Sequence, residues 1–128
     1  MLRLIAVLAV AATCASTASA AATTGIAFGR MGGSIRPFTV TVAADGTVHA
    51  TGPVDTKPVS KQQLARLDRL AASIRFTTLA AATNCTGTNP DVAATFIRIG
   101  HKTVRVHGTC LAGYQRLWNA LNRAAVAS

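Results

Sequence analysis

The chain has 128 residues, half of them hydrophobic, and a net charge of +9 from thirteen Lys and Arg against four acidic residues. A chain of this length builds one hydrophobic core and is too short for two domains. All four acids are aspartates, so chemistry that needs paired carboxylates at a defined separation has few residues to draw on.

Residues 1–20 have the order of parts of a secretory signal peptide. Arg3 precedes an apolar stretch over residues 4–12, and Ala18-Ser19-Ala20 supplies small residues for cleavage. The apolar stretch is too short to cross a bilayer as a helix. We therefore expect cleavage after Ala20, a secreted or extracytoplasmic protein, and a single mature domain over residues 21–128 that lacks a transmembrane span.

Export leaves two of the three cysteines in the mature chain. Cys14 lies in the leader, whereas Cys85 and Cys110 remain as an even pair in an oxidising compartment. Cys85 precedes one predicted strand and Cys110 follows its hairpin partner, so antiparallel pairing brings the two cysteines together. We predict a structural disulfide, because no Cys-x-x-Cys spacing and no neighbouring base indicates a redox pair.

Alternation of apolar and polar residues predicts strands in the first half of the chain. Ile26 and Phe28 form a short alternation that ends at Arg30, and residues 38–51 predict a β-hairpin with Asp45-Gly46 at its turn. The expected core-facing residues of this hairpin are Phe38, Val40, Val42, Val48 and Ala50. The opposite face is expected to carry Thr39, Thr41, Thr47, His49 and Thr51.

A helix start is marked after the proline-containing segment 52–59. Ser60 is a natural N-cap with Gln63 three residues on, which is the spacing of a capping box. The helix is expected to end near Arg75, and it packs through a stripe made of Leu64, Leu67, Leu70, Ala71 and Ile74.

Residues 80–91 show little periodicity and are predicted to form a loop. A second hairpin follows, with strands over 93–99 and 102–107. A final helix is expected over 113–125, with an apolar stripe made of Tyr114, Leu117, Trp118 and Leu121.

This order of elements, β-β-β-α-β-β-α, predicts an α+β fold. We expect an antiparallel sheet of about five strands with two helices packed on one face, one disulfide, and the other face of the sheet open.

Residues that carry chemistry are sparse. His49, His101 and His107 lie in two different hairpins, and the aspartates are confined to loops and a helix surface, so no metal or cofactor site is predicted. The chain has no Gly-x-Ser-x-Gly elbow, no His-Glu-x-x-His motif and no phosphate-binding glycine loop. We therefore predict a protein that is not an enzyme.

The open face of the sheet is the candidate binding surface. Cations interleaved with threonines on an exposed sheet suit an extended or anionic partner. The residues expected there are Arg36, Thr39, Thr41, His49, Arg98, Arg105 and His107. Nucleic acid is not the expected partner, because the aromatic residues needed for base stacking are predicted in the core. Those aromatic residues are Phe28, Phe38, Phe76, Phe96, Tyr114 and Trp118.

The layout resembles a group of small exported bacterial domains of unknown function. The residues that carry this resemblance are the strand from Arg36-Pro37-Phe38, the Asp45-Gly46 turn, the helix from Ser60 to Leu70, and Asp91 before the second hairpin. More distantly, Gly32-Gly33 and the two sheet-helix units are similar to emfourin-type inhibitors of metalloproteases. The first resemblance implies a fold without chemistry, and the second implies an inhibitor-like domain.

These observations predict a secreted, monomeric, non-enzymatic binding domain that takes a protein or an anionic component of the cell envelope. The basic charge has two interpretations, because ten arginines against three lysines also fit the composition bias of a GC-rich genome. The alternative function is a protease inhibitor that acts through a protruding loop at 30–36 or 84–91. An enzyme with an unrecognised site is the third hypothesis, and the segment 52–59 is a second candidate interaction surface.

Overall fold

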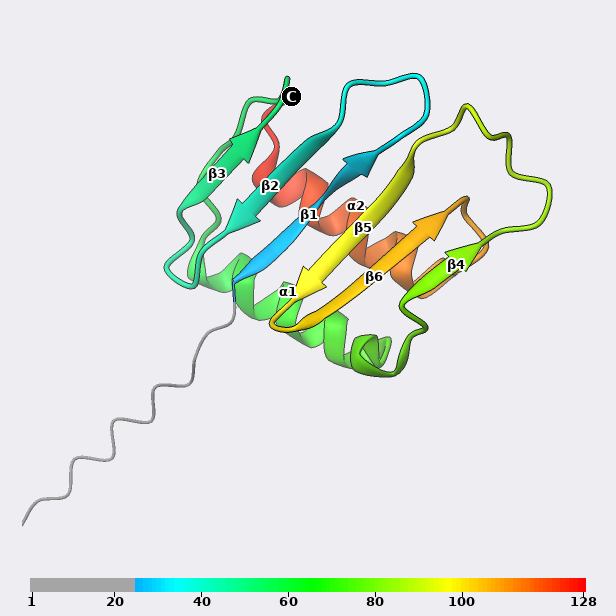
Figure 1. The fold of residues 1–128 in the computed structure, drawn as a ribbon. Coiled ribbons are helices and arrows are strands. Elements are labelled where there is room, and N and C mark those ends of the chain that lie inside the picture. The colour runs from blue at the N-terminus through cyan, green and yellow to red at the C-terminus, as the bar shows by residue number, and fades with distance from the viewer. Residues whose placement is uncertain (1–24) are drawn as a thin grey trace, which may run out of the picture.

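A computed structural model describes residues 25–128, so the leader, its cleavage site and Cys14 lie outside the described residues. Figure 1 shows two layers, a twisted sheet and a pair of helices that cover one of its faces. The strands are β1 (Ile26–Met31), β2 (Phe38–Val42), β3 (Val48–Thr51), β4 (Ala82–Asn84), β5 (Ala94–Ile99) and β6 (Lys102–His107). The helices are α1 (Lys61–Ser73), α2 (Ala112–Ala125) and the short 3₁₀ helix η1 (Phe76–Thr78).

The sheet has the strand order β3-β2-β1-β5-β6-β4. The predicted hairpin over residues 38–51 is confirmed, because β2 and β3 pair antiparallel with Val42 opposite Val48. Strand β1 lies between β2 and β5 and is antiparallel to both, with Phe28 opposite Val40 and Ile97. The two hairpins of the chain are therefore joined into one sheet by β1 at its centre.

Both predicted helices are present. The capping box of α1 is confirmed, since the Gln63 amide donates to Ser60 Oγ and the Ser60 amide donates to Gln63 Oε1. Leu67 is buried and the rest of the predicted α1 stripe packs against the core. Helix α2 begins at Ala112, and all four residues of its predicted stripe are buried. Within residues 25–128, neither helix is long and apolar enough to cross a membrane.

Trp118 joins α2 to the centre of the sheet. Its ring is nearly perpendicular to that of Phe28, with centroids 6.0 Å apart, and its indole N–H donates to the carbonyl of Gly29 at 3.2 Å. Arg30 covers the outer side of the indole, with its guanidinium carbon 4.9 Å from the ring centroid. A buried indole needs such a partner for its polar N–H, so Trp118 also fixes the position of α2 along β1.

The expected sheet of five antiparallel strands is wrong in two respects. The sheet has six strands and is mixed, because residues 82–84, which were expected in a loop, form β4 and pair parallel with β6. Thr83 favours a strand, but Ala82 and Asn84 on either side of it do not, and three residues are too few to show alternation, so β4 has little local signal. Its pairing comes from β6, since Arg105 donates its amide to Ala81 and Cys85 donates to His107.

The predicted disulfide is confirmed between Cys85 and Cys110, whose Cα atoms are 5.6 Å apart. Cys85 directly follows β4 and Cys110 lies between β6 and α2. The bond therefore attaches the edge strand β4 to the point where the chain leaves the sheet for the last helix.

Candidate functional site: the open face of the sheet

The sheet face opposite the helices is the candidate site, and Figure 1 shows it turned toward the viewer without a covering element. The strand registers place its side chains in rows across the sheet. One row consists of His49, Thr41, Ala27, Arg98 and Thr103, and the next consists of Thr51, Thr39, Gly29, Phe96, Arg105 and Ala82. The name "open face" refers below to these two rows.

Phe96 lies on the open face, which corrects its expected place in the core. Its neighbours Thr95 and Ile97 point to the helical side, where the Thr95 hydroxyl is 3.0 Å from the Tyr114 hydroxyl and Ile97 is fully buried. Because side chains alternate along a strand, Phe96 must point the other way. Phe96 is half-buried and takes no part in the core cluster.

Gly29 makes room for the Phe96 ring. The two residues are opposite each other across β1 and β5, and a Cβ atom added to Gly29 would lie 3.0 Å from the Phe96 ring atom Cε1. The same added atom would lie 2.0 Å from the carbonyl oxygen of Phe38, so position 29 accepts no side chain. An aromatic ring that leans over a cross-strand glycine protects the backbone there and leaves its own face accessible.

Two exposed arginines flank Phe96. Arg105 is its direct partner on β6, and Arg98 follows two residues later on the same side of β5. Directly opposite side chains in an antiparallel pair lie about 5 Å apart, and next-but-one residues on a strand about 7 Å. The site therefore consists of the Phe96 ring with one arginine beside it on β6 and another next to it along β5.

Threonine hydroxyls and one histidine extend the open face on the other side of Gly29. Thr39 and Thr51 are opposite each other on β2 and β3, and Thr41 is opposite His49. None of the six strands in the described part of the chain contains an acidic residue. The nearest carboxylate along the chain is Asp45 in the β2–β3 turn, where a hydrogen bond from the Thr47 amide holds its pKa below the usual value.

Two of the predicted binding residues lie outside the two rows of the open face, although alternation along β6 puts His107 on the same side of the sheet as Arg105. Arg36 is exposed but lies in the loop before β2, outside the paired strands. His107 is half-buried at the end of β6, and its ring nitrogen Nε2 is 2.8 Å from the carbonyl oxygen of Val92. Since a carbonyl only accepts, the Nε2–H donates, and this side chain holds the loop before β5.

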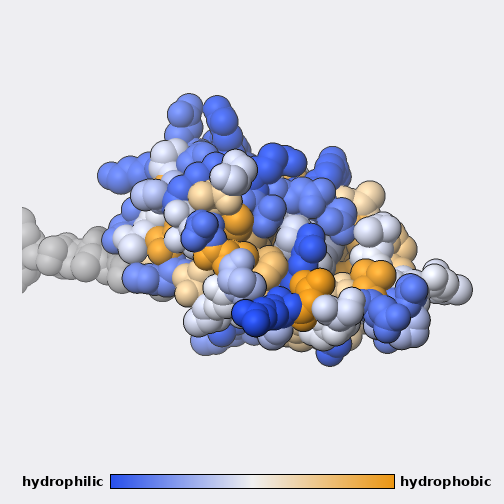
Figure 2. Space-filling model, turned by 90° about the horizontal axis from the view of Figure 1, so that it is seen from above, coloured by the Kyte–Doolittle hydropathy of each residue, from blue (hydrophilic) through white to orange (hydrophobic). Residues whose placement is uncertain are grey.

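The loops that were named as candidates for protease inhibition lie together at one end of the sheet. The Ser34 amide donates to the carbonyl of Asp91 at 3.1 Å, which joins the β1–β2 loop to the β4–β5 loop. The two large hydrophobic side chains exposed in residues 25–128 are on these loops, Ile35 at 40% and Val92 at 50%. Figure 2 views this end of the molecule and shows hydrophobic residues in separate spots among hydrophilic ones.

The side chains that could ligate a metal ion or transfer a proton are scattered within residues 25–128. No group of three His, Cys, Asp or Glu side chains in residues 25–128 is placed to hold a metal ion. The buried phenol of Tyr114 has its pKa raised to about 12 by burial, and it faces Thr95 inside the core rather than a cavity. The arrangement can bind a ligand through charge, hydroxyl groups and one aromatic ring.

The fold and site define a small disulfide-linked α+β domain with a basic open sheet face. Comparison with known proteins adds no family to this description, since no family model, curated protein or solved structure matches the chain.

Proposed function

We propose that this protein is an exported, non-enzymatic binding domain whose open face takes an anionic polymer of the cell envelope. The observation that carries the proposal is the charge of the open face. Arg105 lies beside Phe96 on β6 and Arg98 lies two residues along β5 on the same face, and no strand within residues 25–128 contributes a carboxylate to balance them. A cationic surface of this kind attracts polyanions and excludes other cations.

A polymer made of sugar rings with anionic substituents fits the chemistry of this surface. The ring of Phe96 offers an apolar face, the two guanidinium groups pair with carboxylate or phosphate, and the threonines Thr39, Thr41 and Thr51 offer hydroxyl groups. Arg98 and Arg105 lie in neighbouring rows, so a long polymer that contacts both arginines binds at more than one point and weak single contacts add up. The leader proposed for residues 1–20 would deliver the domain to the compartment that holds such polymers.

The test measures binding of the purified protein to sedimented envelopes of the producing cells. The double variant Arg98→Gln, Arg105→Gln should bind about tenfold more weakly, since two exposed ion pairs are worth roughly 0.7 kcal/mol each. Binding of the unaltered protein should weaken as salt rises from 50 to 500 mM. The matched control is Arg69→Gln, Arg116→Gln, which removes the same charge from exposed positions of the two helices and should leave envelope binding unchanged.

Phe96 provides a second arm of the same test. Phe96→Ala should weaken envelope binding without changing the net charge. Phe96→Leu keeps an apolar group, so its affinity should lie between those of Phe96→Ala and the unaltered protein. Equal binding by the unaltered protein and the Arg98, Arg105 double variant would refute the assignment of the open face. Binding that is insensitive to salt would refute an anionic partner.

A protease inhibitor is the second candidate, and the contact between the two loops favours it. The hydrogen bond from Ser34 to Asp91 holds the two loops side by side, and Ile35 and Val92 are exposed on them. The disulfide at Cys85 anchors the start of the β4–β5 loop to the segment between β6 and α2. A preorganised loop with an apolar tip suits insertion into a protease cleft. Inhibition of secreted metalloproteases that persists at 500 mM salt and is lost in Ile35→Asp would support this function over the first.

A further inference from the structure

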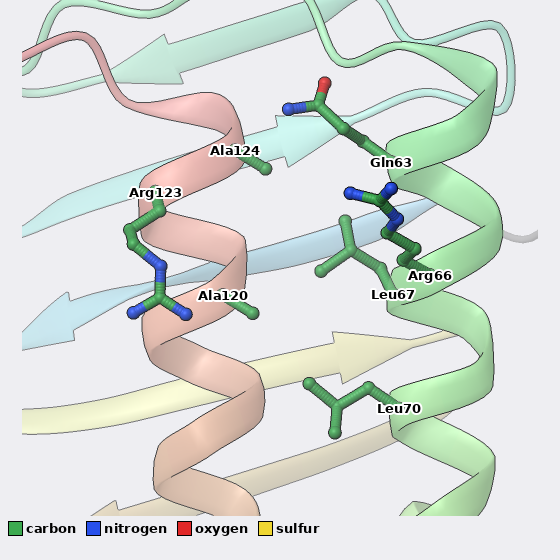
Figure 3. A pocket seen from close by; sticks show the side chains of 7 residues that line it. All are labelled: Gln63, Arg66, Leu67, Leu70, Ala120, Arg123 and Ala124. Carbon is green, nitrogen blue, oxygen red and sulfur yellow. The ribbon is translucent and has the colours of Figure 1, made fainter.

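A groove runs between the two helices, on the layer opposite the open face, and Figure 3 shows it from close by. Leu67 and Leu70 reach into it from α1, and Ala120 and Ala124 face them from α2. Leu67 and Ala124 are almost fully buried and form its floor. The groove has a volume of about 270 Å³, and it exists because two alanine methyl groups do not fill the space opposite two leucines.

Two arginines line this apolar groove, one from each helix. Arg66 and Arg123 are both exposed, and Figure 3 shows Arg66 reaching from α1 toward the gap while Arg123 lies along α2. Helix α2 contains no acidic residue. The single acid of α1, Asp68, is two residues from Arg66, which places it about 200° around the helix axis on the far side. No acidic side chain is among the described residues that line the groove, which combines two arginines at its rim with an apolar floor.

The size and composition of the groove restrict its ligand. Small-molecule sites are mostly apolar with a few polar groups that fix the orientation of the ligand, and they usually hold about 300–1,000 Å³. A groove of about 270 Å³ lies just below this range, so it accommodates one short hydrocarbon chain and is too small for a lipid with two. The guanidinium groups favour a head group such as carboxylate, which arginine binds through paired hydrogen bonds.

We propose that this groove is a second binding site, which takes a single-chain alkyl carboxylate of the fatty-acid class. The carboxylate lies between Arg66 and Arg123, and the hydrocarbon chain lies along Leu67, Leu70 and the two alanines. From Gln63 to Leu70 the helix rises about 10 Å, so affinity increases with chain length until the chain exceeds the groove. This site does not depend on the polymer-binding function of the open face.

The test is calorimetric titration of the purified protein with hexanoate, octanoate and decanoate below their micelle concentrations. One molecule should bind per chain, with affinity rising about two- to fourfold for each added methylene. Octanol and octyltrimethylammonium, which keep the chain and change the head group, should bind at least tenfold more weakly than octanoate. Arg66→Gln, Arg123→Gln should weaken octanoate binding about tenfold, and Arg98→Gln, Arg105→Gln should leave it unchanged.

A groove-filling variant separates a binding site from a general charge effect. Ala120→Leu should abolish octanoate binding while it retains both arginines, and its urea unfolding curve shows whether the fold is intact. Should Ala120→Leu not fold, Ala120→Val with a smaller side chain serves the same purpose. Octanol binding as tightly as octanoate, or octanoate binding that survives the loss of both arginines, would overturn the proposal.

The two binding proposals fail in different ways. Loss of octanoate binding in the Arg98, Arg105 variant would place the ligand on the open face and would overturn the groove site. Loss of envelope binding in that same variant bears on the open face alone. The groove could instead join two copies of this chain. Analytical ultracentrifugation would then show a dimer that Ala120→Leu dissociates. Such a dimer, together with an absence of octanoate binding, would overturn the proposal.

Discussion

Removal of the Cys85–Cys110 disulfide tests how much of the stability of this domain depends on that bond. The bond closes a segment with a sequence separation of 25 residues. In the chain-entropy model, opening such a loop lowers the free energy of unfolding by about 3.5 kcal/mol. The free energy of unfolding of a small domain is only about 5–15 kcal/mol. We therefore expect the double variant Cys85→Ala, Cys110→Ala to lose a large share of this free energy. Little else is lost, because the Cys110 amide that donates to Cys85 Sγ lies in an exposed residue and finds water instead.

The assay is equilibrium urea unfolding followed by the fluorescence of Trp118, the single tryptophan of the chain. With a denaturant slope of about 1–3 kcal/mol/M, the midpoint should fall by roughly 1–3 M. Reductant should move the unaltered protein to the midpoint of the double variant and should not affect the variant itself. Oxidised and reduced proteins whose free energies of unfolding agree within about 0.5 kcal/mol would refute the reasoning.

Two further predictions concern single residues. Burial raises the pKa of Tyr114 to about 12, against about 10 in an unfolded chain. The neutral phenol therefore contributes fully to the free energy of unfolding below pH 10. This contribution, roughly 3 kcal/mol, is lost as the pH rises through 12. The phenolate absorbance of this single tyrosine measures the midpoint directly, and a value near 10 in the folded protein would contradict the prediction. Gly46→Ala should lose roughly 1–3 kcal/mol more free energy of unfolding than Gly87→Ala. Both glycines have positive φ, but an added Cβ at Gly46 lies 2.0 Å from the Val59 carbonyl oxygen, whereas at Gly87 it meets nothing within 4 Å, so equal losses in urea unfolding would exclude the clash.

Local signals explain which parts of the fold could be predicted from the sequence. The capping box at Ser60, the Asp45-Gly46 turn and the alternation of residues 38–42 each depend on neighbours within a few positions. The disulfide could also be predicted from the sequence, because it follows from the order of the hairpin strands and needs no knowledge of side-chain packing. These features are all confirmed by the structure.

Features that depend on residues far apart in the chain could not be predicted in the same way. Strand β4 forms by pairing with the edge of β6, and its three residues, of which only Thr83 favours a strand, are too few to show a pattern. The helical groove depends on which residues of α2 stand opposite Leu67 and Leu70, and a hydrophobic stripe does not reveal this pairing. The periodicity identifies the face of a helix that packs, but the register between two helices is a property of their packing.

The position of Phe96 shows how a buried polar pair determines the chemistry of the surface. In the segment from Thr95 to Ile97 two large apolar residues are adjacent, so one of them must point away from the core. Hydrophobicity alone does not choose between them. The hydroxyl of Tyr114 does, because a buried phenol needs a hydrogen-bond partner and Thr95 supplies it at 3.0 Å only when Thr95 faces the helices. The hydrogen bond that Tyr114 needs in the core therefore places the Phe96 ring on the open face, next to Arg105 on β6 and Arg98 on β5.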